Sequence, residues 1–168
     1  MTPVKEALSR VLADMKRLSG ETVPLQKAHG RVLAEDACAT ISYPPADQSS
    51  MDGYAVIALD TTNAPVSLRQ IGISQAGDGF DGTVSSGETV RIFTGAPLPA
   101  GADASVMQEN TTADGDQITI NEGVGAGNFI RLKGMDFNKG DCLLSAGTRI
   151  TARGLGLLAS ANVAQVSV

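Results

Sequence analysis

Segment 43–56, YPPADQSSMDGYAV, gathers the side chains of this chain that are best suited to bind a ligand. Asp47 and Asp52 supply carboxylates, the two prolines restrict the backbone before them, and Gly53 allows conformations that other residues resist. Paired carboxylates on a stiff turn suit a hydrated Mg²⁺ ion, which keeps several waters and takes only one or two protein oxygens. The alternative is a structural turn between strands, because Asp, Ser and Gly are the residues that turns use. Residue spacing alone favours the structural turn.

A second candidate lies in segment 90–109, VRIFTGAPLPAGADASVMQE, where a strand is expected to end at Thr94. The Thr94 hydroxyl, together with a closely approaching amide at Gly95, could hold an anion. The alternative is a plain Pro-Gly connection between strands, which composition alone favours.

A third candidate lies in segment 127–141, GNFIRLKGMDFNKGD. Arg131 stands at an expected strand end and Asp136 in the next turn, so the two side chains could pair with each other. They could instead face a phosphate or another oxyanion, which a guanidinium binds in a fork. A surface ion pair is the commoner outcome.

The composition excludes several classes of protein. A net charge of −5 and an isoelectric point near 4.7 argue against a nucleic-acid surface, which needs clustered Lys and Arg. No apolar run approaches the roughly 18–20 residues of a membrane span, and the amphipathic N-terminus does not resemble a signal peptide. We therefore expect a cytoplasmic protein that binds neither nucleic acid nor membrane. Cys38 and Cys142 lack metal-type spacing; free thiols are expected, and a disulfide between them stays open.

The secondary structure changes character along the chain. Helical spacing predicts a helix over 4–18 and a shorter one over 25–33, and alternation predicts a strand at 37–41. The middle reads as all-β, with a hairpin turn at Asp114-Gly115 and short β-branched runs separated by Gly, Pro, Asn and Asp. The predicted strands of this middle part cover 54–59, 66–73, 88–93, 104–109 and 117–120.

The C-terminal part mixes both kinds of element again. Strands are predicted at 129–132, 141–144 and 163–168, and Thr151 is expected to cap a helix over 152–161. The chain stops on an alternating strand without a polar tail, which favours a cut before a following domain.

These patterns predict an α+β fold that is mainly β. A small split α/β domain is expected from both ends of the chain, residues 1–45 and 128–168, and it carries the N-terminal helix. An all-β module that resembles a barrel or a sandwich is expected between them, at 46–127.

At the three candidate stretches the chain closely resembles the MoeA and gephyrin E-domain family, the molybdopterin molybdenumtransferases. The motifs SSMDGYAV and RIFTGAPLPAGADASVMQE are long and specific, and GRVLAED at 30–36 and GLLAS at 156–160 support the same alignment. The resemblance covers essentially the whole chain but only the N-terminal portion of a family member.

The resemblance implies an elongated homodimer that inserts molybdenum from molybdate into adenylylated molybdopterin with help from a divalent metal, taken here as Mg²⁺. The aspartate of the MDGYA motif corresponds to Asp52 and the threonine of the TGAP motif to Thr94, which are thereby the expected catalytic residues. Asp52 is also the expected metal ligand, and Arg131 and Asp136 are the expected substrate-binding residues. From residue chemistry we expect Asp52 to position the metal or its water and Thr94 to hydrogen-bond near the phosphates.

The chain departs from the family pattern at a few positions. Ala46 replaces the usual aromatic residue, Gln48 an asparagine and Ser50 an alanine, and Met135 replaces a glutamate beside Asp136. The pterin-binding and C-terminal domains of the family would lie beyond residue 168, so the chain alone is expected to be inactive as a transferase. The alternative is a scaffold or assembly module whose acidic loops are only structural, by analogy with gephyrin.

Overall fold

The computed structural model describes residues 2–13, 15–16 and 18–168. The chain divides into two compact units, an outer unit made of 1–38 and 142–168 and an inserted unit made of 39–141. Among the described residues, no helix is long and apolar enough to cross a bilayer.

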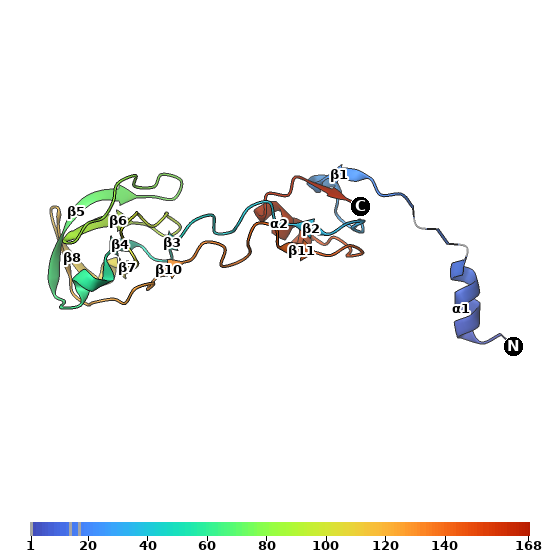
Figure 1. The fold of residues 1–168 in the computed structure, drawn as a ribbon, viewed down its shortest axis with the longest axis horizontal. Helices are drawn as coiled ribbons and strands as arrows, with labels where there is room; N and C mark the ends of the chain where they lie inside the picture. The colour runs from blue at the N-terminus through green and yellow to red at the C-terminus, as the bar shows by residue number, and fades with distance from the viewer. Residues whose placement is uncertain (1, 14, 17) are drawn as a thin grey trace. The chain divides into compact units, whose positions relative to one another are not determined.

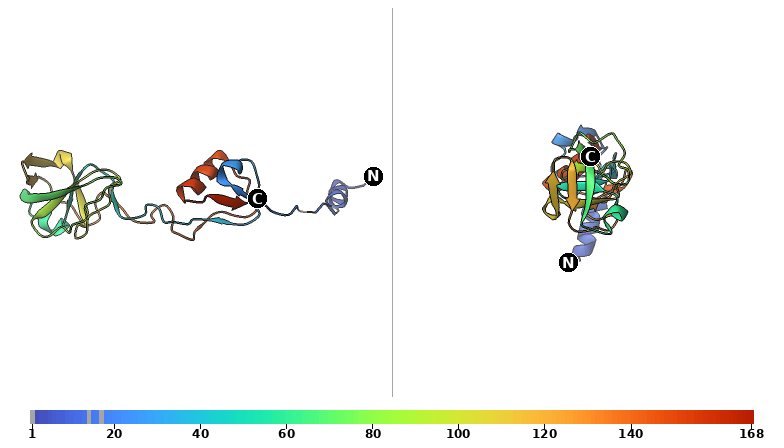
Figure 2. Two further views of the ribbon diagram at one scale, coloured as in Figure 1. Left: turned by 90° about the horizontal axis from the view of Figure 1, so that it is seen from above. Right: turned by 90° about the vertical axis from the view of Figure 1, so that its left-hand side faces the viewer.

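The inserted unit is built on one mixed sheet whose strand order is β7-β4-β6-β5-β9-β8. Figure 1 labels all of these strands except β9, and Figure 2 shows the sheet curling on itself. β5 and β6 run parallel, and the other neighbours are antiparallel. This confirms the mainly β fold class with a barrel- or sandwich-like insert. The strands are β4 (Gly53–Val56), β5 (Val66–Ser74), β6 (Glu88–Ile92), β7 (Ala104–Met107), β8 (Thr111–Asp114) and β9 (Gln117–Ile120).

Both faces of β4, which lies between β7 and β6, are covered by apolar side chains. Tyr54 and Val56 pack with Leu68 and Ile118 on one face, and Ala55 packs in a second cluster on the other. Side chains of a strand alternate between its two faces, so a strand buried on both faces is apolar throughout. The run GYAV therefore marks the centre of this unit.

The predicted hairpin forms between β8 and β9, but its two turn residues are Gly115 and Asp116, one position later than the predicted Asp114-Gly115. Asp114 and Gln117 are register partners, and Gly115 has φ of 61°. Glycine adopts positive φ without the strain that a side chain would add, which suits the two-residue turn.

Four further short elements belong to the inserted unit. β3 (Gln48–Ser49) pairs antiparallel with β10 (Ile130–Arg131), and the 3₁₀ turns η2 (Ala58–Thr61) and η3 (Gln108–Asn110) follow β4 and β7. The predicted strand at 129–132 is thus shorter than expected, because Phe129 has φ of 57°, outside the extended region.

The outer unit joins segments from the two ends of the chain. β1 (Thr22–Pro24) pairs with β12 (Gln165–Ser167), and β2 (Ala37–Cys38) pairs with β11 (Cys142–Leu144). The helix α2 (Ala152–Ser160) begins where predicted, since the Thr151 hydroxyl accepts a hydrogen bond from the Gly154 amide at 3.2 Å. The predicted strands at 37–41 and 163–168 are shorter in the structure.

The predicted helix over 25–33 is wrong. Only the 3₁₀ turn η1 (Leu25–Lys27) forms there, and Gly30 has φ of 77°. The amides that a helix would use locally pair elsewhere: Gly30 donates to the Ile150 carbonyl and Leu33 to the Thr148 carbonyl. A pairing with residues more than a hundred positions away therefore replaces the helix.

The N-terminal helix α1 (Val4–Ala13) is shorter than the predicted 4–18. Its first turn is closed by the Ala7 amide, which donates to the Pro3 carbonyl at 3.0 Å. Residues 14 and 17 lie outside the described residues, so the predicted continuation is only partly described.

The two compact units differ in extent from the predicted domains. The structure divides the chain after Cys38 and after Asp141, whereas the sequence places the divisions after residues 45 and 127. Segments 39–45 and 128–141 thus belong to the inserted unit by compactness. Compactness does not show whether a segment folds independently, so the predicted domain boundaries stay a prediction.

Candidate functional site

Asp52 and Thr94, more than forty residues apart in sequence, meet at one edge of the curled sheet. Asp52 immediately precedes β4 and Thr94 follows β6, and these antiparallel strands align Gly53 with Ile92. Oδ1 of Asp52 accepts two hydrogen bonds from Thr94, one from the backbone N–H and one from the hydroxyl, each 2.8 Å long. Both residues are exposed to solvent. The MDGYA and TGAP motifs therefore form one polar feature.

Gly53 and Gly95 allow Asp52 and Thr94 to lie within hydrogen-bonding distance, for different reasons. A Cβ on Gly53 would overlap the carbonyl oxygen of Val106 in the adjacent strand β7, so only glycine lets β4 and β7 approach there. Gly95 has φ of 81°, and its amide donates to the Ser49 carbonyl at 2.8 Å. A side chain at Gly95 would strain the turn that presents Thr94.

The hydrogen bonds keep the Asp52 carboxyl ionised. The Thr94 amide lowers the pKa of Asp52 most and the Thr94 hydroxyl lowers it further. Desolvation opposes them by raising this pKa, and the positive charge of Arg91 lowers it by the least amount. Among the residues that the structure describes, no hydrogen bond reaches Oδ2. Asp52 thus holds one carboxylate oxygen in place through Thr94 and leaves the other toward solvent.

Arg91 is a member of this site that the sequence analysis missed. Its guanidinium lies 5.1 Å from the Tyr54 ring centroid and 4.8 Å from that of Phe93, within the range of a cation–π contact. It donates to the Gly53 carbonyl at 3.0 Å and to Oε1 of Gln108 at 2.5 Å. A cation is therefore fixed beside Asp52. The signal in the sequence was a lone Arg inside the apolar run VRIF, two residues before an aromatic side chain.

Ser49 anchors the loop that carries Asp52. This buried hydroxyl donates to the Met51 carbonyl at 2.7 Å and lies 3.1 Å from the hydroxyl of Ser105 in β7. The Gln108 amide also donates to the Asp52 carbonyl at 3.0 Å. The position of the Asp52 carboxylate is therefore set by the backbone of the loop as well as by Thr94.

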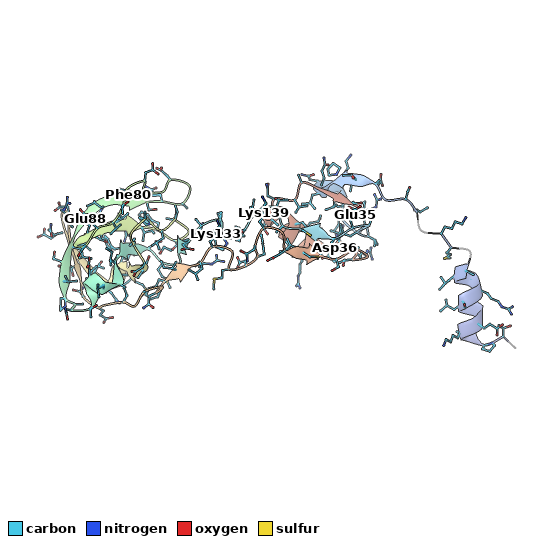
Figure 3. All side chains as sticks on the ribbon, in the orientation of Figure 1. Glu35, Asp36, Phe80, Glu88, Lys133 and Lys139 are labelled. Carbon is cyan, nitrogen blue, oxygen red and sulfur yellow. The ribbon has the colours of Figure 1, made fainter. Side chains whose placement is uncertain are left out.

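The second carboxylate of the loop has a structural partner. Oδ1 of Asp47 accepts a hydrogen bond from the Lys133 backbone N–H at 2.7 Å, and the Asp47 carbonyl accepts one from the Leu98 amide. Lys133 is labelled in Figure 3. Asp47 thereby connects the first candidate stretch to the third, as a structural turn residue would.

Arg131 and Asp136 pair with each other, one of the two outcomes left open by their spacing. Nη2 of Arg131 lies 2.8 Å from Oδ2 of Asp136, and both side chains are about four-tenths exposed. An exposed pair of this kind contributes little stability. The pairing of β10 with β3 aligns Arg131 with Gln48, four residues before Asp52. The contact uses one of the five guanidinium N–H groups, so the others stay able to bind an anion.

The four predicted site residues belong to no metal cluster in the described part of the chain, and they lie outside the hollow of the outer unit. Within the described residues, no group of three or more His, Cys, Asp or Glu side chains is placed to hold a metal. A hollow of about 880 Å³ lies in the outer unit, lined by residues such as Arg31 and Val168 and by none of the four predicted site residues. A metal at Asp52 would take most of its ligands from water or from a bound substrate.

A family model described as the MoeA N-terminal region (domain I and II) matches residues 2–162. The chain belongs to this MoeA family. A molybdopterin molybdenumtransferase of Staphylococcus aureus is 36% identical over 170 residues, which cover 99% of this chain and 41% of that protein. A protein of the same name from a Nostoc species is 39% identical over 152 residues, 88% of this chain and 35% of that protein.

Solved structures agree with this MoeA assignment. Two crystal structures of a molybdopterin biosynthesis MoeA protein from Pyrococcus horikoshii match the whole chain with TM-scores of 0.90 and 0.92 at 34% and 35% identity. The chain covers 44% and 46% of those two chains. It therefore spans less than half the length of the relatives that it matches, and it corresponds to their N-terminal portion.

Proposed function

We propose that this chain is the N-terminal part of a molybdopterin molybdenumtransferase, which inserts molybdenum from molybdate into adenylylated molybdopterin during molybdenum cofactor biosynthesis. The observation that supports this proposal most is the Asp52–Thr94 pair, in which two motifs distant in sequence meet at the exposed ends of two strands. The name shared by the relatives supports the transferase class.

Asp52 and Thr94 are the proposed catalytic residues. The pair holds one carboxylate oxygen in place, so the other can accept a proton or a hydrogen bond from a water at a defined position. The Thr94 hydroxyl donates its hydrogen bond to Asp52 in this arrangement. To donate to a substrate phosphate, as proposed, it would have to break that bond. Arg91 adds a fixed positive charge that favours an anionic ligand beside the pair.

A divalent metal, proposed to be Mg²⁺, fits this donor set only as a hydrated ion. Asp52 offers one unshared carboxylate oxygen, and Mg²⁺ commonly binds through one or two carboxylates while keeping its waters or taking substrate phosphates. Asp52 would hold the metal, whose chemistry would be to offset phosphate charge and polarise a bound water.

Arg131 and Asp136 are the proposed substrate-binding pair. Arg131 would turn unused N–H groups toward an anionic substrate, and Asp136 would keep the guanidinium oriented. Met135, which replaces a family glutamate beside Asp136, reduces the negative charge in this turn and so favours an anion there.

The complete protein is proposed to be a cytoplasmic homodimer whose pocket is finished by parts that this chain lacks. The chain spans 41% of the Staphylococcus aureus relative, so most substrate contacts would come from elsewhere. We therefore propose that this chain alone does not turn over adenylylated molybdopterin. The second candidate function, a non-catalytic scaffold, is favoured by the ion pair between Arg131 and Asp136, in which these exposed side chains bind each other.

The test is the variant Asp52→Asn in the complete protein. Removing the charge while keeping an acceptor for Thr94 should lower molybdenum insertion on the order of 10²-fold and leave the fold unchanged. Asp116→Asn is the matched control, because Asp116 is an exposed acid of the same unit outside the site. Insertion at the wild-type rate per folded molecule of Asp52→Asn would favour the scaffold.

A further inference from the structure

The two cysteines of the chain lie opposite each other in the outer unit. Cys38 of β2 and Cys142 of β11 are register partners, although 103 residues separate them in sequence. Directly opposed residues of antiparallel strands project to the same face of the sheet. Both cysteines are exposed, while Ala37 and Ala39 on either side of Cys38 are buried, so the thiols share the solvent face.

The backbone hydrogen bonds define the kind of pair that they form. The Ala39 N–H donates to the Asp141 carbonyl at 2.9 Å, so this bond joins the residues that flank the cysteine pair. A flanking bond of this kind identifies Cys38 and Cys142 as a non-hydrogen-bonded pair, whose Cα atoms are typically about 4.5 Å apart. Disulfides span Cα separations of roughly 4.4–6.8 Å. The strands therefore hold the two thiols within bonding range.

We propose that Cys38 and Cys142 form a modification site, a cross-strand dithiol that a low-molecular-weight disulfide such as oxidised glutathione converts into an intramolecular disulfide. The structure records both cysteines as free, which is the reduced state of this site.

The reaction is two successive thiol–disulfide exchanges. One protein thiol releases its proton to solvent and its sulfur bonds to a glutathione sulfur, while the other glutathione leaves as a thiolate and takes up a proton. The second protein thiol then loses its proton and attacks the protein sulfur of the mixed disulfide, which releases the second glutathione. The two protein thiols lose two electrons in total, and one glutathione disulfide is reduced to two thiols.

The surroundings assign the first attack to Cys142. Desolvation by the neighbouring protein raises the pKa of the Cys38 thiol most, and Cys142 and Asp36 raise it further. Asp36, labelled in Figure 3, lies two residues before Cys38. Since the thiolate is the nucleophile, a thiol that keeps its proton attacks slowly. Cys38 is then the resolving thiol, placed by the strand pairing.

The bond would join the two segments of the outer unit covalently. The chain leaves that unit after Cys38 and returns at Cys142, so a disulfide closes the whole inserted unit into a loop. Closing a loop of this length restricts the unfolded chain strongly. We expect the melting temperature of the oxidised protein to exceed that of the reduced protein by an amount on the order of 5–10 °C.

The experiment treats the reduced, folded protein with oxidised glutathione and follows its intact mass. The expected product is lighter than the starting protein by two hydrogens and carries no glutathione, and its digest contains Cys38 and Cys142 in one reducible peptide pair. Cys38→Ser should stop at a stable glutathione adduct on Cys142. Cys142→Ser should gain its adduct on Cys38 more slowly. In denaturing urea the wild type should accumulate adducts, because the strands no longer hold the thiols together.

Three results would overturn the proposal. One is a folded wild type that retains glutathione adducts at the end of the reaction. Another is unchanged mass in the folded wild type, since the cysteine pair would then not react with oxidised glutathione at all. The third is a product that runs as a disulfide-linked dimer on a non-reducing gel.

Discussion

At the scale of single residues, the site depends on how one carboxylate is held. Asp52 receives both hydrogen bonds on the same oxygen, and the donors belong to a turn that follows a different strand. Such bonds favour the ionised carboxyl and lose their partner when it is protonated. The site can therefore be probed through Asp52 without any substrate.

The first prediction concerns the titration of Asp52. Its pKa in the folded chain lies below that of the unfolded chain, so the Thr94 hydrogen bonds stabilise the fold above the unfolded pKa. This stabilisation should be lost as pH falls through the folded pKa. Carboxyl carbon shifts in an NMR titration should show the pKa of Asp52 below the ordinary value of an aspartate. A pKa at or above that ordinary value would contradict the described hydrogen bonds.

The second prediction concerns Gly53. A methyl group there meets the Val106 carbonyl, so Gly53→Ala should destabilise the inserted unit by roughly 2–3 kcal/mol in urea unfolding. Gly125→Ala is the matched control, since its Cβ would meet only the Asn128 side chain at an ordinary 3.8 Å and should change stability little. Equal effects of the two substitutions would show that the close approach of β4 and β7 is not limiting.

Residue types alone did not identify the site. Spacing favoured structural turns at all three stretches, and only the family resemblance singled out Asp52 and Thr94. Asp47, the other acid of the first loop, binds a backbone amide instead. Arg91 was missed because it follows Val90 in a strand, where its contacts with Tyr54 depend on the register of β4 with β6.

At the scale of elements, local signals succeeded where the hydrogen bonds are local. The hairpin of β8 and β9 and the helix capped by Thr151 use partners within a few residues, and both elements were predicted, the hairpin with its turn one residue early. The segment 25–33 has a helical pattern, but its amides at Gly30 and Leu33 bond to residues 148–150. The local sequence pattern at 25–33 does not indicate hydrogen-bond partners that lie so far along the chain.

The third prediction belongs to α2. Thr151→Ala removes the acceptor of the Gly154 amide and should cost about 1 kcal/mol of unfolding free energy in the outer unit. Thr151→Ser keeps the hydroxyl and should stay close to the wild type. Chemical denaturation followed by far-ultraviolet circular dichroism measures both unfolding free energies. A serine variant as unstable as the alanine variant would show that the hydroxyl cap does not stabilise α2.

At the scale of the whole molecule, the chain corresponds to the N-terminal portion of its relatives. Its inserted unit presents the Asp52–Thr94 pair, and its relatives are more than twice its length. The mainly β fold was predictable because alternation and turn residues recur every few positions. The extent of the compact units was not, since segments 39–45 and 128–141 hold each other through pairings such as Tyr43 with Phe137.

The fourth prediction is that this chain alone has no transferase activity. The purified chain, incubated with adenylylated molybdopterin, molybdate and Mg²⁺, should release no nucleotide above a protein-free blank. The complete protein serves as the positive control in the same assay. Nucleotide release by the isolated chain that disappears in Asp52→Asn would place the whole hydrolytic site within residues 1–168.

The coupling between Asp52 and Thr94 tests the central claim most directly. Molybdenum insertion would be measured in the complete protein for Asp52→Ala, Thr94→Val and the double variant, with rates normalised to folded protein. If the two side chains act as one unit, the double variant should be as active as the less active of the two single variants. The two losses of activation free energy would then be far from additive. Losses that multiply independently, or single variants that insert molybdenum at the wild-type rate, would contradict the account.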